Sequence, residues 1–192
     1  MYKYFPKTKD ALVKIIKSEV ERKGWNCDLN HIVVSQITDM SYLFSGSLSA
    51  YKLEEFNGDI SRWDVSSVEN MDSMFSGAKA FNQPIDDWDV SNVKNMSHMF
   101  YGAKSFNQPI GDWNVSNATN MDYMFYLAES FNQPIGDWDV SNVTDMRNMF
   151  HWAEKFNQDL SNWQINVDDD YHTTCMFDEC PIKNKYKPKG IR

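Results

Sequence analysis

Tryptophan recurs every 25 residues through most of this chain, at Trp63, Trp88, Trp113, Trp138 and Trp163. The frame Phe-Asn-Gln-Pro-Ile-x-x-Trp-x-Val-Ser-Asn surrounds the three middle tryptophans, and weaker copies begin at Phe56 and Phe156. A fixed period of this length is typical of repeat proteins, in which each unit packs against its neighbours. The sequence therefore predicts a single elongated repeat domain.

Each repeat divides into two apolar patterns. The segment Ile85-x-x-Trp88-x-Val90 predicts a short parallel strand with alternating side chains. The next apolar residues are three and four apart, which is typical of one face of a helix, and they are Val93, Met96, Met99, Phe100 and Ala103. We therefore expect an α/β solenoid, a right-handed leucine-rich-repeat-like coil with short parallel strands on one face and helices on the other, with about six coils plus an N-terminal capping helix.

The ends of the repeat region differ from its middle. Residues 1–28 predict a helical cap that begins at Thr8 and ends at Gly24, and residues 29–165 form the repeat region with its 25-residue period. The first coil carries an insertion of six residues around 47–52. Residues 166–182 predict a degenerate C-terminal cap, and residues 183–192 a basic mobile tail.

A fixed asparagine follows the first phenylalanine of each repeat. We expect this column to hydrogen-bond the backbone of the turns, because a polar residue at a fixed, buried turn position needs such partners. The tryptophan and methionine columns predict buried core. The asparagines are Asn57, Asn82, Asn107, Asn132 and Asn157.

The frame Phe-Asn-Gln-x-Ile-x-x-Trp-Asp-Val-Ser-Asn-Val-x-x-Met-x-x-Met-Phe resembles the BspA-like leucine-rich-repeat proteins. It is closest to their bacterial surface-protein repeat of about 26 residues, which is common in mycoplasmas, listeriae and epsilonproteobacteria. The resemblance covers roughly Leu29 to Phe177. It implies a solenoid and, for some surface members, adhesion to host proteins, and it carries no enzymatic residues.

Charge and hydropathy argue against two classes of function, nucleic-acid binding and membrane spanning. The chain holds 27 acidic and 19 basic residues, a net charge of −8, and the acidic residues concentrate in the repeats while both ends are basic. Nucleic acid is an unfavourable partner for such a body, since binding a polyanion needs clustered Lys and Arg. We expect no membrane span and no signal peptide at the start of the sequence. This predicts a cytoplasmic protein if the sequence is taken as written, and a cell-surface protein if a signal or anchor has been trimmed from it.

Aspartates dominate the outward positions beside the tryptophans. Like charges stacked at about 4.8 Å repel one another by roughly 1 kcal/mol per pair in water. Three interpretations remain open: solvent-tolerated turn residues, an acidic docking face for a protein with a basic surface, or calcium held between carboxylates. The candidate binding face is Asp64, Asp87, Asp89, Asp112, Asn114, Asp137 and Asp139.

We therefore predict a non-catalytic protein-protein interaction module that presents an acidic sheet face to a basic partner. The alternative is surface adhesion or glycan binding through the exposed aromatic residues Tyr101, Tyr123 and Tyr126. An enzyme is the third interpretation, and the chain contains no recognisable catalytic set. Self-association through the end coils is a further prediction.

Three residues near the C-terminus have metal-binding side chains. His172, Cys175 and Cys180 are close in sequence, but a fourth ligand is not evident and the spacing matches no standard zinc pattern. The sequence therefore favours a degenerate cap with small apolar thiols and predicts no bound cofactor or metal.

Overall fold

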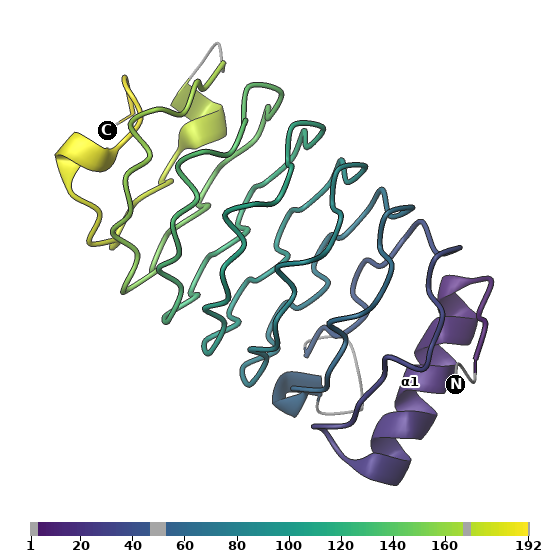
Figure 1. The fold of residues 1–192 in the computed structure, drawn as a ribbon. Coiled ribbons are helices and arrows are strands. Elements are labelled where there is room, and N and C mark those ends of the chain that lie inside the picture. The colour runs from purple at the N-terminus through teal and green to yellow at the C-terminus, as the bar shows by residue number, and fades with distance from the viewer. Residues whose placement is uncertain (1–3, 47–52, 167–169, 192) are drawn as a thin grey trace.

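The computed structural model describes residues 4–46, 53–166 and 170–191. The chain winds into coils that stack side by side, with the helix α1 (Lys9–Lys23) at one end and the C-terminus at the other (Figure 1). We name each coil by its tryptophan: the first coil begins at Leu29, the Trp63 coil spans 56–80, the Trp88, Trp113 and Trp138 coils follow at equal length, and the Trp163 coil spans 156–182. Three short 3-10 helices complete the elements of the described residues, η1 (Leu53–Glu55), η2 (Asp170–Thr173) and η3 (Asn184–Tyr186).

The helix α1 covers the open side of the first coil. Its start is capped by Thr8, whose hydroxyl accepts a hydrogen bond from the N–H of Ala11 at 3.2 Å. Gly24, at a φ of 86°, ends it, as the sequence predicts. The buried face of α1 contributes Leu12, Ile16 and Val20 to the core.

The segment expected to form a helix in each coil instead forms consecutive turns. In the Trp63 coil, Ser73 and Gly77 have positive φ values of 56° and 71°, and an α-helix requires negative φ throughout. The N–H groups of Met71 and Phe75 donate to carbonyls of the Trp88 coil at 2.9 Å. Between them, the N–H of Met74 donates to the carbonyl three residues back, at 3.1 Å. Alternate N–H groups therefore connect neighbouring coils.

In the Trp63 to Trp138 coils, the described segment expected to form a strand makes no backbone hydrogen bond to the next coil. The N–H of Trp88 donates to the carbonyl of Ile85 in its own coil, at 3.2 Å. Among the described residues, parallel pairing consists of isolated bridges, and the continuous series lies in the segment assigned to helix: Asp39, Asn70, Asn95, Asn120 and Asp145. The expected α/β solenoid of strands and helices is therefore wrong, because turns and single bridges replace both elements.

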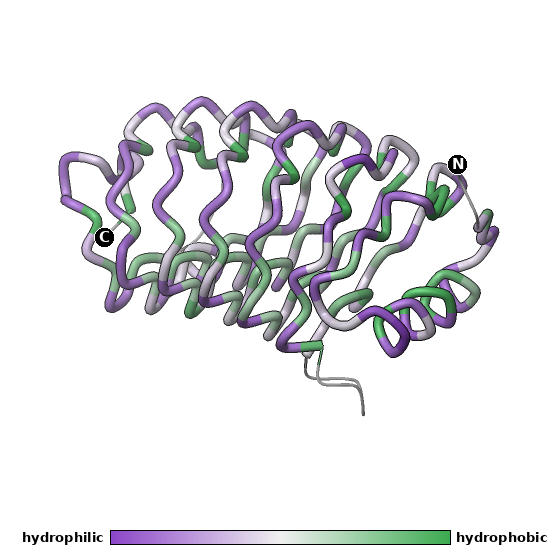
Figure 2. The backbone as a smooth tube through the Cα atoms, turned by 60° about the horizontal axis from the view of Figure 1, so that its bottom comes forward, coloured by the Kyte–Doolittle hydropathy of each residue, from purple (hydrophilic) through white to green (hydrophobic). Residues whose placement is uncertain are grey.

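Columns of apolar side chains fill the interior of the stack. Hydrophobic positions recur at the same places in successive coils (Figure 2). Two phenylalanine columns interdigitate: Phe100 lies 5.6 Å from Phe75 in its own column and 3.9 Å from Phe106 in the other, between ring centroids. The methionines of every described repeat are completely buried, for example Met96 and Met99, which confirms that the methionine stripe is core.

Two polar columns fix the register between coils. Each buried tryptophan donates its indole N–H to a carbonyl of the preceding coil, as Trp113 does to Ile85 at 3.1 Å. Each asparagine after the first phenylalanine accepts a hydrogen bond from the backbone of the next coil, as Asn107 does from Asn132 at 2.9 Å. The predicted asparagine column and the predicted burial of the tryptophans are confirmed.

Both ends of the stack keep the common register. The N–H of Met40 donates to the carbonyl of Asn70 at 2.9 Å, which places Met40 opposite Met71. The insertion predicted at 47–52 lies outside the described residues. The basic tail, for which the sequence predicts mobility, contacts the stack over 183–191: the Lys183 N–H donates to Asn157, and the Leu160 N–H to Tyr186.

Candidate functional site

Three aspartates form a column on the surface next to the tryptophans. Asp87, Asp112 and Asp137 occupy the same position in three consecutive coils, and all three are exposed. Within the described parts of the chain, no hydrogen bond or ion pair engages their carboxylates. We call these residues the outer aspartate column. Its negative charge is therefore available to a ligand.

A second column lies two residues further along each coil. The Asp89 carboxylate accepts a hydrogen bond from the Ser91 N–H at 3.0 Å, and Asp139 accepts one from Ser141 at 3.1 Å. The hydroxyl and N–H of the serine lower the pKa of Asp89, and likewise that of Asp139. Asp64 and Asn114 make the same contact. This turn aspartate column has a local structural role, which an asparagine also fills.

The tyrosines expected to be exposed are half-buried and stack on one another. Tyr101 and Tyr126 lie in consecutive coils with ring centroids 4.8 Å apart and planes within 7°. Tyr123 is tilted against Tyr126 at 5.5 Å. Burial raises the pKa of Tyr101, and the neighbouring tyrosines add to the effect. The structure therefore brings the three predicted tyrosines together.

Three further aromatic residues extend this group, and the sequence interpretation missed them. His98 stacks on Tyr123 at 4.8 Å, and His151 contacts Tyr126 at 5.1 Å. Trp152 lies beside His151 at 6.0 Å and is 43% exposed. The 25-residue spacing of Tyr101, Tyr126 and His151 was the available signal. We call the six residues the aromatic cluster.

A buried carboxylate lies next to the aromatic cluster. Burial raises the pKa of Asp122, and the nearby carboxylates of Asp145 and Asp72 raise it further, against the opposing effect of His98 and Arg147. Arg147 binds Asp145 at 2.6 Å and lies 3.9 Å from Asp122. These contacts make a packed ion network between coils rather than an open cleft.

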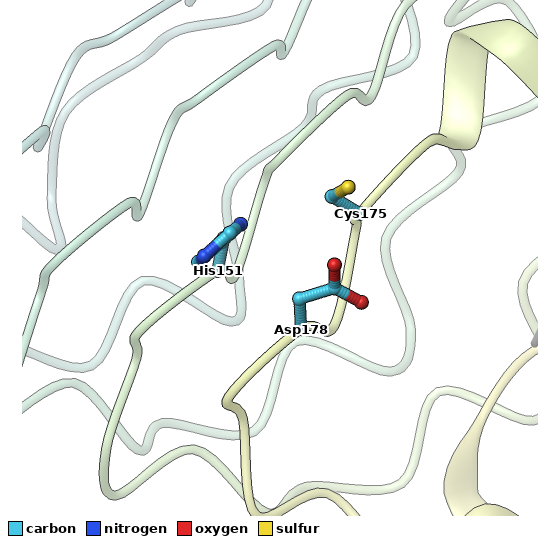
Figure 3. A group of neighbouring side chains, drawn as sticks. All are labelled: His151, Cys175 and Asp178. Carbon is cyan, nitrogen blue, oxygen red and sulfur yellow. The ribbon is translucent and has the colours of Figure 1, made fainter.

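The ligand atoms of His151, Cys175 and Asp178 all lie within 4.8 Å of one another (Figure 3). This group joins the Trp138 coil to the Trp163 coil. Of the predicted zinc candidates it includes only Cys175, because the Cys180 thiol contacts the Phe156 carbonyl at 3.5 Å and His172 lies 4.0 Å from Asp145. In the described part of the chain, the aspartates of the acidic face form no comparable group of three, so calcium there gains no support.

The family described as Mycoplasma protein of unknown function, DUF285, matches over residues 16–128 and again over 86–187. The chain belongs to this family. No curated protein and no solved structure matches it.

Membership of the DUF285 family agrees with the mycoplasmal side of the resemblance found in the sequence. The expected leucine-rich repeat is wrong. Throughout the described residues, the coils of this DUF285 chain lack the strand and the helix that define such a repeat. No helix in the described ranges has the length and apolar character needed to cross a membrane.

Proposed function

We propose that this DUF285 chain is a non-catalytic protein-binding module whose acidic face binds a basic protein surface. The single observation that carries the proposal is the outer aspartate column: Asp87, Asp112 and Asp137 are exposed, in register and without an ion pair among the described residues. Aligned charges of one sign attract an oppositely charged partner and speed its association.

The distribution of basic side chains supports this proposal. Lysines on other surfaces of the stack pair with carboxylates of neighbouring coils: Lys79 binds Glu54 at 2.9 Å, and Lys104 binds Glu129 at 2.6 Å. The acidic face has Arg62 beside it, but this guanidinium lies 3.9 Å from Asp28. These pairs neutralise part of the charge elsewhere between coils, whereas no ion pair among the described residues neutralises the outer aspartate column.

The backbone beside the column supports a preorganised surface. Asp89 and Asp139 fix the turn that follows each tryptophan through hydrogen bonds to serine N–H groups. The tryptophan itself is anchored to the preceding coil, as in the bond from Trp138 to Ile110 at 3.1 Å. A rigid spacing between carboxylates reduces the entropy lost on binding.

The test is affinity capture with wild type and with the triple variant Asp87→Asn, Asp112→Asn, Asp137→Asn. Asparagine keeps the shape and removes the charge. A matched variant, Asp10→Asn, Glu21→Gln, Glu154→Gln, changes the net charge equally at exposed positions elsewhere. We expect wild type and the matched variant to retain a partner that the column variant loses. Equal retention of that partner by all three proteins would contradict the proposal.

A second candidate function rests on the aromatic cluster. Stacked rings beside the exposed Trp152 offer apolar faces of the kind that bind sugar rings. Glycan-array binding that persists at high salt and is lost in Tyr126→Ala and Trp152→Ala would favour this function. Adhesion to host proteins, which the BspA-like resemblance implies, is compatible with either surface.

A further inference from the structure

We propose that His151, Cys175 and Asp178 form a zinc site that fastens the last coil to the stack. The three ligand atoms lie within 4.8 Å of one another. Around a tetrahedral zinc ion, ligand atoms are about 3.3–3.8 Å apart, given zinc bonds of about 2.0–2.3 Å. Small side-chain rotations are therefore enough to bring the three atoms to bonding distance.

The backbone holds the ligands in place from both coils. The N–H of Trp152 donates to the Asp178 carbonyl at 3.1 Å, and the N–H of Phe150 donates to the Met176 carbonyl at 2.9 Å. Within the last coil, the N–H of Asp178 donates to the Cys175 carbonyl at 3.3 Å. This turn places the thiol and the carboxylate on the same side, next to the imidazole (Figure 3).

Asn148 orients the imidazole for metal binding. Its side-chain oxygen lies 3.1 Å from Nδ1 of His151. An amide oxygen accepts hydrogen bonds, so in the tautomer with the proton on Nδ1 this contact is a hydrogen bond and Nε2 keeps the lone pair that would bind a metal. Zinc-binding histidines usually have such a partner on the other ring nitrogen.

The repeat pattern changes at this junction. Between the Trp88 and Trp113 coils, the two equivalent columns hold stacked rings: His98 on Tyr123 and Tyr101 on Tyr126, each pair 4.8 Å apart. In the last coil the same columns hold Cys175 and Asp178. Ring stacking is thus replaced by ligand side chains where the last coil joins its neighbour.

The ligand types select the metal. Calcium and magnesium prefer oxygen ligands alone, whereas imidazole with thiolate suits zinc. Bound to zinc, the Cys175 side chain would be a thiolate and the Asp178 side chain a carboxylate. A zinc ion would stabilise both anions and leave its fourth position to water. Because binding requires the folded junction, zinc would stabilise the last coil.

The test is zinc titration of metal-free protein without an affinity tag, followed by calorimetry and thermal unfolding. We expect one zinc ion per chain and a rise in Tm of about 5–10 °C at a zinc concentration near 100 times Kd. Cobalt in place of zinc is expected to give the absorption band of a thiolate-to-cobalt bond. Absence of saturable binding by wild type would overturn the proposal.

Matched variants separate this site from adventitious binding. His151→Ala, Cys175→Ser and Asp178→Asn are each expected to lower the affinity at least tenfold, and Cys175→Ser to abolish the cobalt band. His172→Ala and Cys180→Ser remove a histidine and a cysteine of the same coil and are expected to bind zinc like wild type. Circular dichroism without zinc checks that each variant folds. The proposal would be overturned if the three ligand variants kept the zinc affinity of wild type, or if His172→Ala and Cys180→Ser lost zinc affinity as strongly as the ligand variants do.

Discussion

The indole N–H of Trp113 donates a hydrogen bond to the carbonyl oxygen of Ile85, one coil earlier, at 3.1 Å. Both groups are buried, and the side chain of Trp113 is 3% exposed. The same bond recurs at every tryptophan of the repeat frame, so it ties each coil to its predecessor. The tryptophan column is therefore a structural column and not an exposed binding platform.

Replacing Trp113 by phenylalanine removes this donor and keeps an aromatic ring. The Ile85 carbonyl then lacks its partner in the core, and the smaller ring leaves a gap. We expect a loss of about 2–4 kcal/mol in the free energy of unfolding, measured with urea. Trp152→Phe is the control, because Trp152 is 43% exposed and is expected to change stability by less than about 0.5 kcal/mol. Equal losses in the two variants would contradict this structural role.

The asparagine column offers a second stability test. The side-chain oxygen of Asn107 accepts hydrogen bonds from the Asn132 N–H at 2.9 Å and from Gln133 at 3.0 Å. Asn107→Ala leaves these donors without a partner, and we expect a loss of about 1–3 kcal/mol in urea unfolding. Asn107→Asp keeps the acceptor and is expected to lose less. A larger loss for aspartate than for alanine would argue against the acceptor role.

Glu19 predicts a specific acid sensitivity. Burial opposes its ionisation, but hydrogen bonds from Lys23, Arg22 and Tyr4 outweigh burial and lower its pKa from 4.5 to about 2. Since the pKa is lower in the folded chain, this stabilisation is fully present above about pH 4.5 and is lost as the pH falls toward 2. The ionised Glu19 carboxylate therefore adds about 3 kcal/mol to the free energy of unfolding at neutral pH.

The variant Glu19→Gln isolates this contribution. We expect wild type to exceed the variant in free energy of unfolding by a constant amount above pH 5, and the gap to narrow as the pH is lowered through the window between the two pKa values. Glu21→Gln, at an exposed position of the same helix, serves as the control. A gap between wild type and Glu19→Gln that is independent of pH would contradict the assigned pKa.

The register of the stack was predictable because it depends on residue identity at fixed spacing. The repeat length, the capping of α1 by Thr8, the buried tryptophans and the asparagine column all follow from such spacing. The division into a cap, repeat region and tail stays a prediction. So do the roles of the aspartates and tyrosines.

The local backbone was not predictable from apolar spacing. Met96, Met99 and Phe100 are three and four residues apart, and a run of turns buries such residues as well as a helix does. The deciding feature is the positive φ of His98, at 54°, which apolar spacing does not encode. The zinc group was missed for a different reason: His151 lies one coil before Cys175, so only the register of the coils brings the two together.

The most direct test of the proposed function is the affinity of the captured partner, measured at low and high salt for wild type and for the variant with Asp87, Asp112 and Asp137 changed to asparagine. We expect wild type to bind the partner about tenfold or more tightly than the variant at low salt, and this difference to shrink at high salt as the charges are screened. Equal affinities for the two proteins at low salt would contradict the claim that the outer aspartate column is the binding surface.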